Sequence, residues 1–502
     1  RMPASPFLRW HPSSGAARQL DANQGELSKQ IEVNPQIGIQ RLTAEYHFGN
    51  ESELWDDYIF NQCIRPVLEK NLQDSLKNSI NRFSIIDHSL FLNYIRREED
   101  PSRFRRAFWH VNSYGLRLAE RFSKQHLQDY GHQEIQLKYN QGKKYKIAFV
   151  LKGPFKLAHC EFLASFLKGT RHFSDLVEVF LILVDDNKEA VGIANVNIIS
   201  LAGSSATFSK LVHYYRICKY YQFDNICWVA CVQNLSLYMG AQLAPAQSYW
   251  SMKYHSIIMP TIQKYAGLGF GGDSFLYDDV EWYRGRAFPE LNMKPIDESQ
   301  KRNLLRTKKI AVDSLVIGCF VRSEKLHSSD YWNAIIELLS TSARVHFVMA
   351  SQDIPRSALE ILNTSICKDR FHHLGWVNTK EWAYVLDLYF DSSPRGSCNT
   401  IFEAIEAGVP ILMSDSEHNR ESSALPYLQS AAGSGNEVPG VYADLKKRVE
   451  SAKKLLIDPD ARQTIAADQK RLLTALQGSS HLFAKDYLNY FTDKKMTLKR
   501  AA

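Results

Sequence analysis

One segment of this 502-residue sequence, residues 386–414, strongly limits the fold that the chain can adopt. Residues 386–390 are mostly apolar, 392–400 are small and polar, 401–406 have helical character, and 409–413 are apolar again. With Gly408 and Pro410 ending the helix, the pattern predicts a strand, a polar loop, a helix, a tight turn and a buried strand. Such a unit is typical of an α/β protein with parallel strands.

The polar loop of this segment is predicted to lie at the N-terminus of the helix. Ser397, Asn399 and Thr400 would then stand beside free backbone N–H groups and the positive end of the helix dipole, which favour an anion. Glu403 follows within about one turn, where its carboxylate could accept hydrogen bonds from a ribose. An ordinary, well-capped strand–helix–strand crossover explains the same pattern without a ligand.

Apolar runs of strand length alternate with helical patterns in two parts of the chain. This alternation predicts an α/β fold with two Rossmann-like, doubly wound units. We expect residues 239–256 to pass into an irregular loop, and we expect no strand after about residue 440. The predicted organisation is a flexible arm (1–26), an α-helical domain (27–140), a first Rossmann-like unit (141–294), a polar linker (295–309), and a second Rossmann-like unit with terminal helices (310–502).

Composition excludes several classes of protein. A net charge of +7 over 502 residues with both signs mixed argues against a nucleic-acid-binding protein. Eight cysteines without a Cys-x-x-Cys pair or a Cys/His zinc spacing favour a reducing, cytoplasmic compartment and no bound metal. No apolar run is long enough for an integral membrane segment. Residues 267–272 match Gly-x-Gly-x-x-Gly formally, but neither flank suits a dinucleotide site, and a flexible turn is preferred.

Ligands of parallel sheets bind at the carboxyl ends of the strands, so the loops there supply further candidates. Lys325 follows a predicted strand and can neutralise a phosphate, although a solvated lysine fits the pattern as well. His159 is a candidate general base, and its alternative is a structural histidine. Lys152 lies in the same loop as His159, while Lys253 and His255 lie in the irregular segment 239–256.

Four segments together resemble the GT-B glycosyltransferases, and more narrowly the O-GlcNAc transferase superfamily with the related bacterial adhesin N-glycosyltransferases. They are the histidine-bearing loop (152–165), the Ala-Pro-Ala-Gln element ending at Gln247, the strand and loop that lead to Lys325, and the loop and helix at 391–410. The segments lie between about residues 150 and 420.

The resemblance implies a GT-B architecture in which the first unit faces the acceptor and the second binds the nucleotide sugar. It implies inverting, metal-independent transfer from a UDP-sugar (UDP-GlcNAc or UDP-Glc) to a protein side chain, with no cofactor besides this co-substrate. His159 would serve as base or orienting group and Glu403 would bind the ribose. The donor nucleotide would be held by Lys325, Arg395, Gly396, Ser397, Asn399, Thr400 and Glu403, and the acceptor and sugar side would include Lys152, Gln247, Lys253 and His255.

The sequence departs from the family at two places, so the sugar and the acceptor remain open. Residues 251–255 replace the family's Gly-His-Pro or Gly-Tyr-Pro, and 398–400 replace its histidine or threonine pair. One alternative is a GT-B enzyme acting on lipid or polysaccharide, or a 2-epimerase. Another is a non-catalytic, transferase-like partner subunit that binds an acceptor protein. Residues 27–140 could also support an oligomer.

Overall fold

The computed structural model describes residues 29, 33 and 119–496, apart from 133–134, 136, 141, 143, 156, 158–159, 187, 204–206, 230–234, 253–260, 269–272, 278–279, 327, 394, 417–418, 421–422, 434 and 479. The predicted arm (1–26) and most of the predicted helical domain (27–140) therefore lie outside the described residues. Residues 119–129 of that domain form a helix. The Ser123 Oγ of this helix donates a hydrogen bond to the carbonyl of Leu237, at 2.6 Å.

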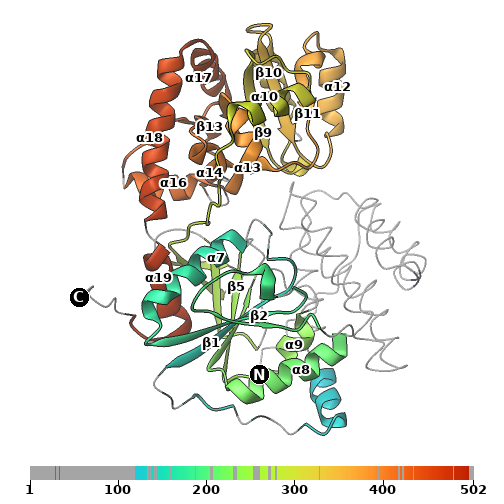
Figure 1. Ribbon diagram of the computed structural model, residues 1–502, viewed down its shortest axis with the longest axis vertical. Helices are drawn as coiled ribbons and strands as arrows, with labels where there is room; N and C mark the ends of the chain where they lie inside the picture. Colours follow the sequence, from blue (N-terminus) through green and yellow to red (C-terminus); the bar gives the residue numbers. More distant parts are fainter. Residues whose placement is uncertain are drawn as a thin grey trace, which may run out of the picture.

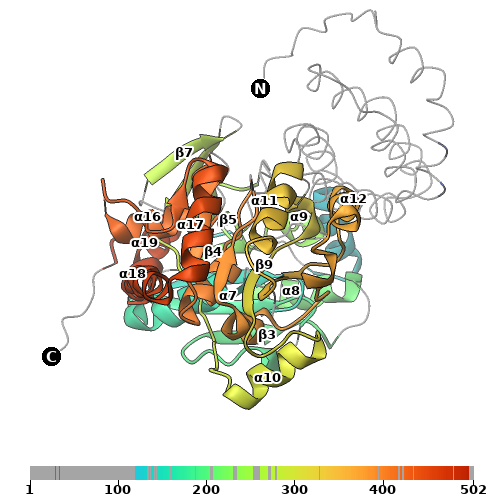
Figure 2. The same ribbon diagram turned by 90° about the horizontal axis from the view of Figure 1, so that it is seen from above.

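The first unit is built on an eight-stranded sheet with the order β3-β2-β1-β4-β5-β6-β8-β7. All neighbouring pairs are parallel except β7 and β8, and β7 lies at the periphery in Figure 2. The strands are β1 (Tyr145–Leu151), β2 (Val177–Leu183), β3 (Asn197–Ser200), β4 (Asn225–Val229), β5 (Ala246–Ser251), β6 (Lys264–Leu268), β7 (Asp273–Tyr277) and β8 (Val280–Gly285). The helices are α7 (Cys160–Gly169), α8 (Thr207–Tyr221) and α9 (Ser236–Gly240), with 3-10 turns η2 (Thr170–Phe173) and η3 (Lys188–Ala190).

The prediction of an irregular loop over 239–256 is wrong at residues 246–251, whereas Lys253 and His255 of this segment lie outside the described residues. Residues 246–251 form β5, which lies between β4 and β6 and is buried along most of its length. Its polar side chains have partners inside the sheet: Gln247 accepts from the Trp228 indole at 3.0 Å, and Ser248 accepts from the Asn225 side-chain amide at 2.9 Å. A polar sequence can form a central strand when its polar groups are satisfied in this way.

The second unit is built on a six-stranded, all-parallel sheet with the order β11-β10-β9-β12-β13-β14. Its strands are β9 (Leu315–Phe320), β10 (Val345–Ala350), β11 (Phe371–His373), β12 (Leu388–Phe390), β13 (Ile411–Ser414) and β14 (Val441–Tyr442). Its helices are α10 (Glu298–Thr307), α11 (Ser329–Leu339), α12 (Arg356–Thr364), α13 (Thr379–Trp382), α14 (Asn399–Glu406), α16 (Leu425–Ala432), α17 (Leu445–Ile457) and α18 (Pro459–Gln477), with 3-10 turns η4 (Ser323–Lys325), η5 (Lys368–Arg370) and η6 (Ala383–Val385).

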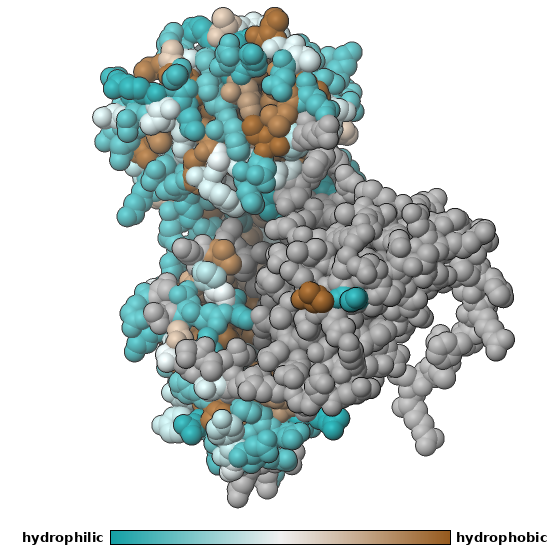
Figure 3. Space-filling model, turned by 90° about the vertical axis from the view of Figure 1, so that its right-hand side faces the viewer, coloured by the Kyte–Doolittle hydropathy of each residue, from teal (hydrophilic) through white to brown (hydrophobic). Residues whose placement is uncertain are grey.

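Alternate side chains along the strands of the second sheet enter two different cores, because successive residues of a strand point to opposite faces. Ile317 and Cys319 of β9 pack with the buried faces of α11, α12 and α17. Val316 and Phe320 of the same strand pack with α14, α16 and α18 on the other face. The two-residue strand β14 contradicts the expectation that no strand follows residue 440. On the face seen in Figure 3, this unit carries hydrophilic residues with hydrophobic ones interspersed.

The boundaries of the two units differ from those predicted. Part of the predicted linker 295–309 is α10, which begins with a capping box between Asp297 and Gln300 and lies with the second unit (Figure 1). The last helix, α19 (Ser480–Thr492), lies beside α7 of the first unit although it follows α18 of the second (Figure 1). Its Tyr487 ring stacks on Trp250 of β5, with 4.5 Å between ring centroids. The final helix of the predicted unit 310–502 therefore packs against the first unit.

Candidate nucleotide-binding site

The loop before α14 follows β12 at the carboxyl edge of the second sheet and is fixed by buried polar side chains. The Asp391 carboxylate, which is fully buried, accepts hydrogen bonds from the Ser397 N–H at 3.0 and 3.2 Å. Asn419, also buried, accepts from the Gly396 N–H and donates to the Ser414 carbonyl at 2.7 Å. The N–H groups of Gly396 and Ser397 are thus used to hold the loop in place.

Two predicted phosphate ligands, Ser397 and Thr400, face the end of β9. Thr400 Oγ1 donates to the Phe320 carbonyl at 2.9 Å, and Ser397 Oγ lies 3.4 Å from the same oxygen. The buried Tyr389 hydroxyl is 3.0 Å from Thr400 Oγ1 and 3.4 Å from Ser397 Oγ. These hydroxyls bind the helix start to the strand. The Ile401 and Phe402 N–H groups in the first turn of α14 donate to the Cys398 carbonyl, at 3.1 and 3.3 Å. An anion at this edge would meet the positive end of the helix dipole.

Lys325 ends η4, just after β9, and reaches the same loop. Its Nζ donates a hydrogen bond to the Gly396 carbonyl at 2.7 Å. Burial raises the pKa of Asp391 to about 6, against the opposing effects of the Ser397 hydrogen bonds and the positive charges of Arg448 and Lys325. The structure therefore brings together four members of the predicted donor-binding set: Lys325, Gly396, Ser397 and Thr400. Arg395 lies half-buried in the same loop, and its carbonyl accepts a 2.6 Å hydrogen bond from Ser392 Oγ.

Glu403, the predicted ribose ligand, lies one turn into α14 and is only 4% exposed. Burial raises the pKa of its carboxyl group to about 7, and the nearby Glu161 adds to this effect, whereas Thr379 and Lys380 oppose it. Its Oε2 has no hydrogen-bond partner within the described part of the chain. Glu403 is thus a buried carboxyl group with one oxygen that a ligand hydroxyl could satisfy.

Sequence reasoning missed two charged residues of the site, Glu161 and Lys380. Glu161 stands in the first turn of α7, and its carboxylate accepts from Lys380 Nζ at 2.6 Å and from Asn399 Nδ2 at 2.7 Å. The starts of α7 and α14 therefore meet directly across the two units. No local pattern could reveal this contact, because its partners are 219 and 238 residues apart in sequence.

An exposed aromatic residue at the same edge was also missed. Trp376 lies between β11 and α13, four residues before Lys380, and its side chain is 80% exposed. Single exposed apolar residues are common on proteins. A tryptophan in the loop that leads to the charged cluster is, however, a candidate surface for a planar ligand group.

The predicted acceptor-side residues have mixed outcomes. His159, Lys253 and His255 lie outside the described residues. Lys152 directly follows β1 and is half-buried. Gln247 is 2% exposed, and its side-chain N–H group lies 3.3 Å from the Met239 and Thr261 carbonyls. The structure thus places Gln247 in the core of the first unit, where it satisfies backbone and indole groups instead of facing the site.

Metal and membrane features were assessed for the described residues alone. Across them, no group of three or more His, Cys, Asp or Glu residues is arranged to hold a metal ion. None of the helices described has both the length and the apolar character needed to cross a membrane.

No protein-family model matches the sequence, and no curated protein matches it. Solved structures do match. A single-residue mutant of the O-GlcNAc transferase from Thermobaculum terrenum aligns over 95% of this chain and 97% of its own, with 13% identity and a TM-score of 0.51. A glycosyltransferase from Rickettsia africae aligns over 70% of this chain and 99% of its own, with 11% identity and a TM-score of 0.46. At these identities the likeness concerns the fold, and the chain has the two-unit GT-B fold that the sequence resemblance predicted.

Proposed function

We propose that this protein is a GT-B glycosyltransferase that moves a sugar from a UDP-sugar to a protein side chain. The observation that carries the proposal is the meeting of Lys325 with the loop that opens α14. A cation and the positive end of a helix then share the carboxyl edge of one sheet, where nucleotides bind in open α/β proteins. The fold shared with an O-GlcNAc transferase supports UDP-GlcNAc as the first donor to test and UDP-Glc as the second.

The proposed reaction is a single displacement with inversion. A nitrogen or oxygen of the acceptor side chain attacks the anomeric carbon, the bond from this carbon to the β-phosphate oxygen breaks, and UDP leaves with the bonding electrons. The proton of the acceptor passes to a base, for which we propose His159. Lys325 and the first N–H groups of α14 would stabilise the charge that develops on the diphosphate, so that a metal ion is not required.

The remaining roles follow from the positions of the side chains. Glu403 would accept hydrogen bonds from the ribose through its unpartnered Oε2. Arg395 and Asn399 would contact the diphosphate. The protein acceptor rests on the sequence resemblance. A cytoplasmic location is supported by the described cysteines at 218, 227, 319, 367 and 398, none of which forms a disulfide.

The test incubates the protein with a panel of UDP-sugars and acceptor proteins, and measures the release of UDP and the modification of the acceptor. We expect turnover with UDP-GlcNAc or UDP-Glc. It is detected as UDP release and as a mass increase on a protein of one N-acetylhexosamine or one hexose, respectively. The variants Lys325→Ala and His159→Ala should lose most of this turnover. Lys453→Ala is the matched control, because Lys453 pairs with Glu337 on the outer face of α17.

Three outcomes would contradict the proposal in different ways. Full activity of both variants would refute the site assignment. Sugar found only on lipid or polysaccharide would refute the protein acceptor. If none of the UDP-sugars is turned over and UDP does not bind, a non-catalytic partner subunit would be favoured.

A further inference from the structure

The carboxylate of Glu161 contacts Asn399, one of the residues proposed to hold the diphosphate. It belongs to the first unit, yet it accepts from Asn399 Nδ2, on the first residue of α14 in the second unit, at 2.7 Å. Its other oxygen is 2.6 Å from Lys380 Nζ. One intramolecular anion therefore occupies a donor on the first residue of α14, the helix proposed to receive the diphosphate, and a lysine of the preceding helix α13.

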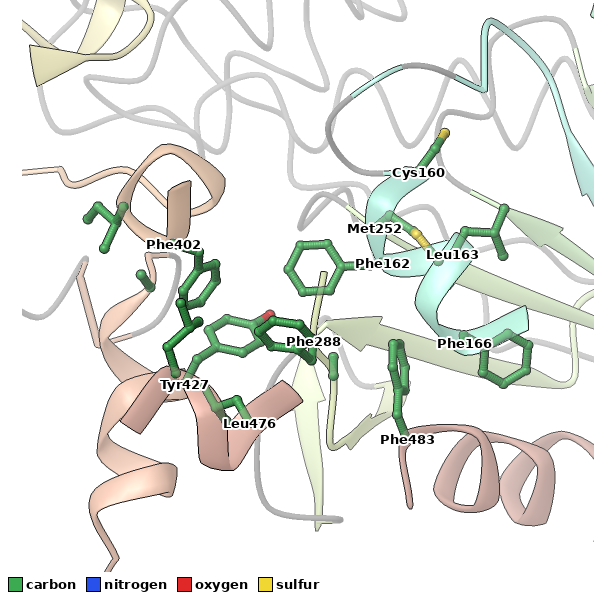
Figure 4. Close-up of a cluster of buried hydrophobic side chains, with 14 of the residues drawn as sticks. Cys160, Phe162, Leu163, Phe166, Met252, Phe288, Phe402, Tyr427, Leu476 and Phe483 are labelled. Carbon is green, nitrogen blue, oxygen red and sulfur yellow. The ribbon is translucent and has the colours of Figure 1, made fainter. Parts of the chain in front are cut away.

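The contact is supported on both sides, so it is a defined feature of this arrangement of the units. On the first unit, the Glu161 carbonyl accepts from the Glu290 N–H at 3.0 Å, which ties α7 to the chain that leaves β8. Across the interface, the next residue, Phe162, packs on Tyr427 of α16, with 5.8 Å between ring centroids. Phe288 packs on Phe402 of α14 at 6.0 Å (Figure 4).

A nucleoside diphosphate at the start of α14 would compete with the Glu161 carboxylate. Both are anions, and a diphosphate in contact with Asn399 would lie beside the carboxylate that Asn399 and Lys380 hold. Like charges at hydrogen-bond range of a shared donor repel, and this repulsion is strongest where water is partly excluded. Glu161 is 19% exposed and Lys380 is 24% exposed, so screening by solvent is limited.

We propose that Glu161 is an autoinhibitory latch, which holds the two units together by occupying Asn399 and Lys380 until a nucleoside diphosphate displaces it. The inference rests on the proposed donor site. It adds that part of the binding free energy of the donor is used to separate Glu161 from Asn399 and Lys380. Donor binding and separation of the α7–α14 contact are then linked, since each favours the other. Removing the charge of Glu161 strengthens donor binding, which distinguishes a latch from a residue that positions the donor.

The test compares wild type, Glu161→Gln and Glu290→Gln in calorimetric titrations with UDP, inorganic pyrophosphate and uridine. Glutamine keeps the shape of Glu161 and removes its charge. We expect Glu161→Gln to bind UDP and pyrophosphate about ten-fold more tightly, with uridine binding unchanged, because relief of repulsion acts on the anionic part of the ligand. Glu290→Gln is the control, since Glu290 pairs with Lys168 inside the first unit and should leave all three affinities unchanged.

Each other outcome has a definite meaning. If Glu161→Gln binds UDP equally or less tightly while wild type binds it, the latch is refuted and the donor site stands. A gain that is equally large for uridine also refutes it, because charge competition cannot act on a neutral nucleoside. If no form binds UDP or pyrophosphate, the donor site and the latch both fail. Should Glu161→Gln not fold, Glu161→Asp, which withdraws the carboxylate by one methylene, is expected to show the same gain in smaller measure.

Discussion

The Nζ of Lys325 lies 2.7 Å from the carbonyl oxygen of Gly396, so the end of β9 is joined to the loop before α14 by a charged hydrogen bond. The positive charge of the same lysine lowers the pKa of buried Asp391 and so opposes the effect of burial. The Asp391 carboxylate in turn accepts a hydrogen bond from the Ser397 N–H. A cation in this position can exchange the carbonyl for a phosphate oxygen with little movement. It is therefore the side chain on which diphosphate binding is expected to depend most.

Replacing Lys325 by methionine should weaken pyrophosphate and UDP binding together. Methionine keeps much of the length of the side chain and removes its charge, and a hydrogen bond to a charged group contributes about 1.5–3 kcal/mol, or roughly ten- to hundred-fold in affinity. Calorimetric titration measures the loss, and Lys325→Arg should recover part of it. Unchanged pyrophosphate affinity in Lys325→Met would show that the phosphates bind elsewhere.

Gly396 should not tolerate alanine. A Cβ at this position would collide with the Asp391 carboxylate and would lie 2.8 Å from the Asn419 Oδ1, and both of these side chains are buried. Overpacking of this kind costs about 1–3 kcal/mol. Denaturant unfolding should show the loss for Gly396→Ala. Gly192→Ala is the control, because its Cβ would meet no atom within 4 Å; equal stability of the two variants would contradict the described loop.

Trp376 is expected to provide a stacking surface for the uracil ring. Its indole is 80% exposed and lies four residues before Lys380, and stacking of a base on an aromatic side chain contributes about 1–3 kcal/mol. Trp376→Ala should therefore weaken UDP and uridine binding about ten-fold and leave pyrophosphate binding unchanged. Tyr220→Ala removes a similarly exposed aromatic ring from α8 of the other unit and should affect none of the three ligands. A loss shared by pyrophosphate would argue against stacking.

The sequence predicted those parts of the fold whose signals are local. Runs such as 147–151 and 347–350 are continuously apolar because parallel strands are covered on both faces, and both lie within strands of the structure. Residues 246–251 were missed because their polar side chains find partners only after β4 and β5 pair, as Asn225 and Ser248 do. Hydropathy alone cannot show that a polar group will be satisfied by a distant one.

The same distinction applies to the site. Thr400 and Glu403 could be placed from sequence, because a loop followed by a helix fixes their positions relative to each other. Glu161 and Lys380 could not, because they meet only when the two units come together. The position of α19 was missed for the same reason: its helical pattern is clear, but nothing in it says that Tyr487 will stack on Trp250.

This position of α19 leads to a further prediction. Tyr487 is fully buried, stacks on Trp250, and donates to the Gly267 carbonyl at 2.5 Å. Tyr487→Ala should cost about 3–5 kcal/mol, as large-to-small changes of buried aromatic residues do. The loss should appear as a lower free energy of unfolding in denaturant titrations followed by circular dichroism. Tyr442→Phe, which removes only a hydroxyl from β14 of the second unit, should leave this transition unchanged.

The buried carboxyl group of Glu403 should make the stability of the protein fall as pH rises. Burial raises its pKa from 4.5 to about 7, so between these values the folded protein holds a proton that the unfolded chain has lost. The free energy of unfolding then decreases across this window, by about 3 kcal/mol in total, and levels off above pH 7. Below pH 4.5 both states are protonated and the effect disappears.

Glu403→Gln should remove this dependence, because glutamine resembles the protonated carboxyl group at every pH. Relative to wild type, the variant should gain stability on going from pH 4.5 to pH 8, measured by denaturant unfolding at both values, even if the amide itself fits less well. Glu406→Gln, on the same helix but paired with Lys470 near the surface, should show no such gain. If Glu403→Gln is destabilised more at pH 8 than at pH 4.5, Glu403 is held as a carboxylate by a cation. A ligand hydroxyl would then compete with that cation for the carboxylate.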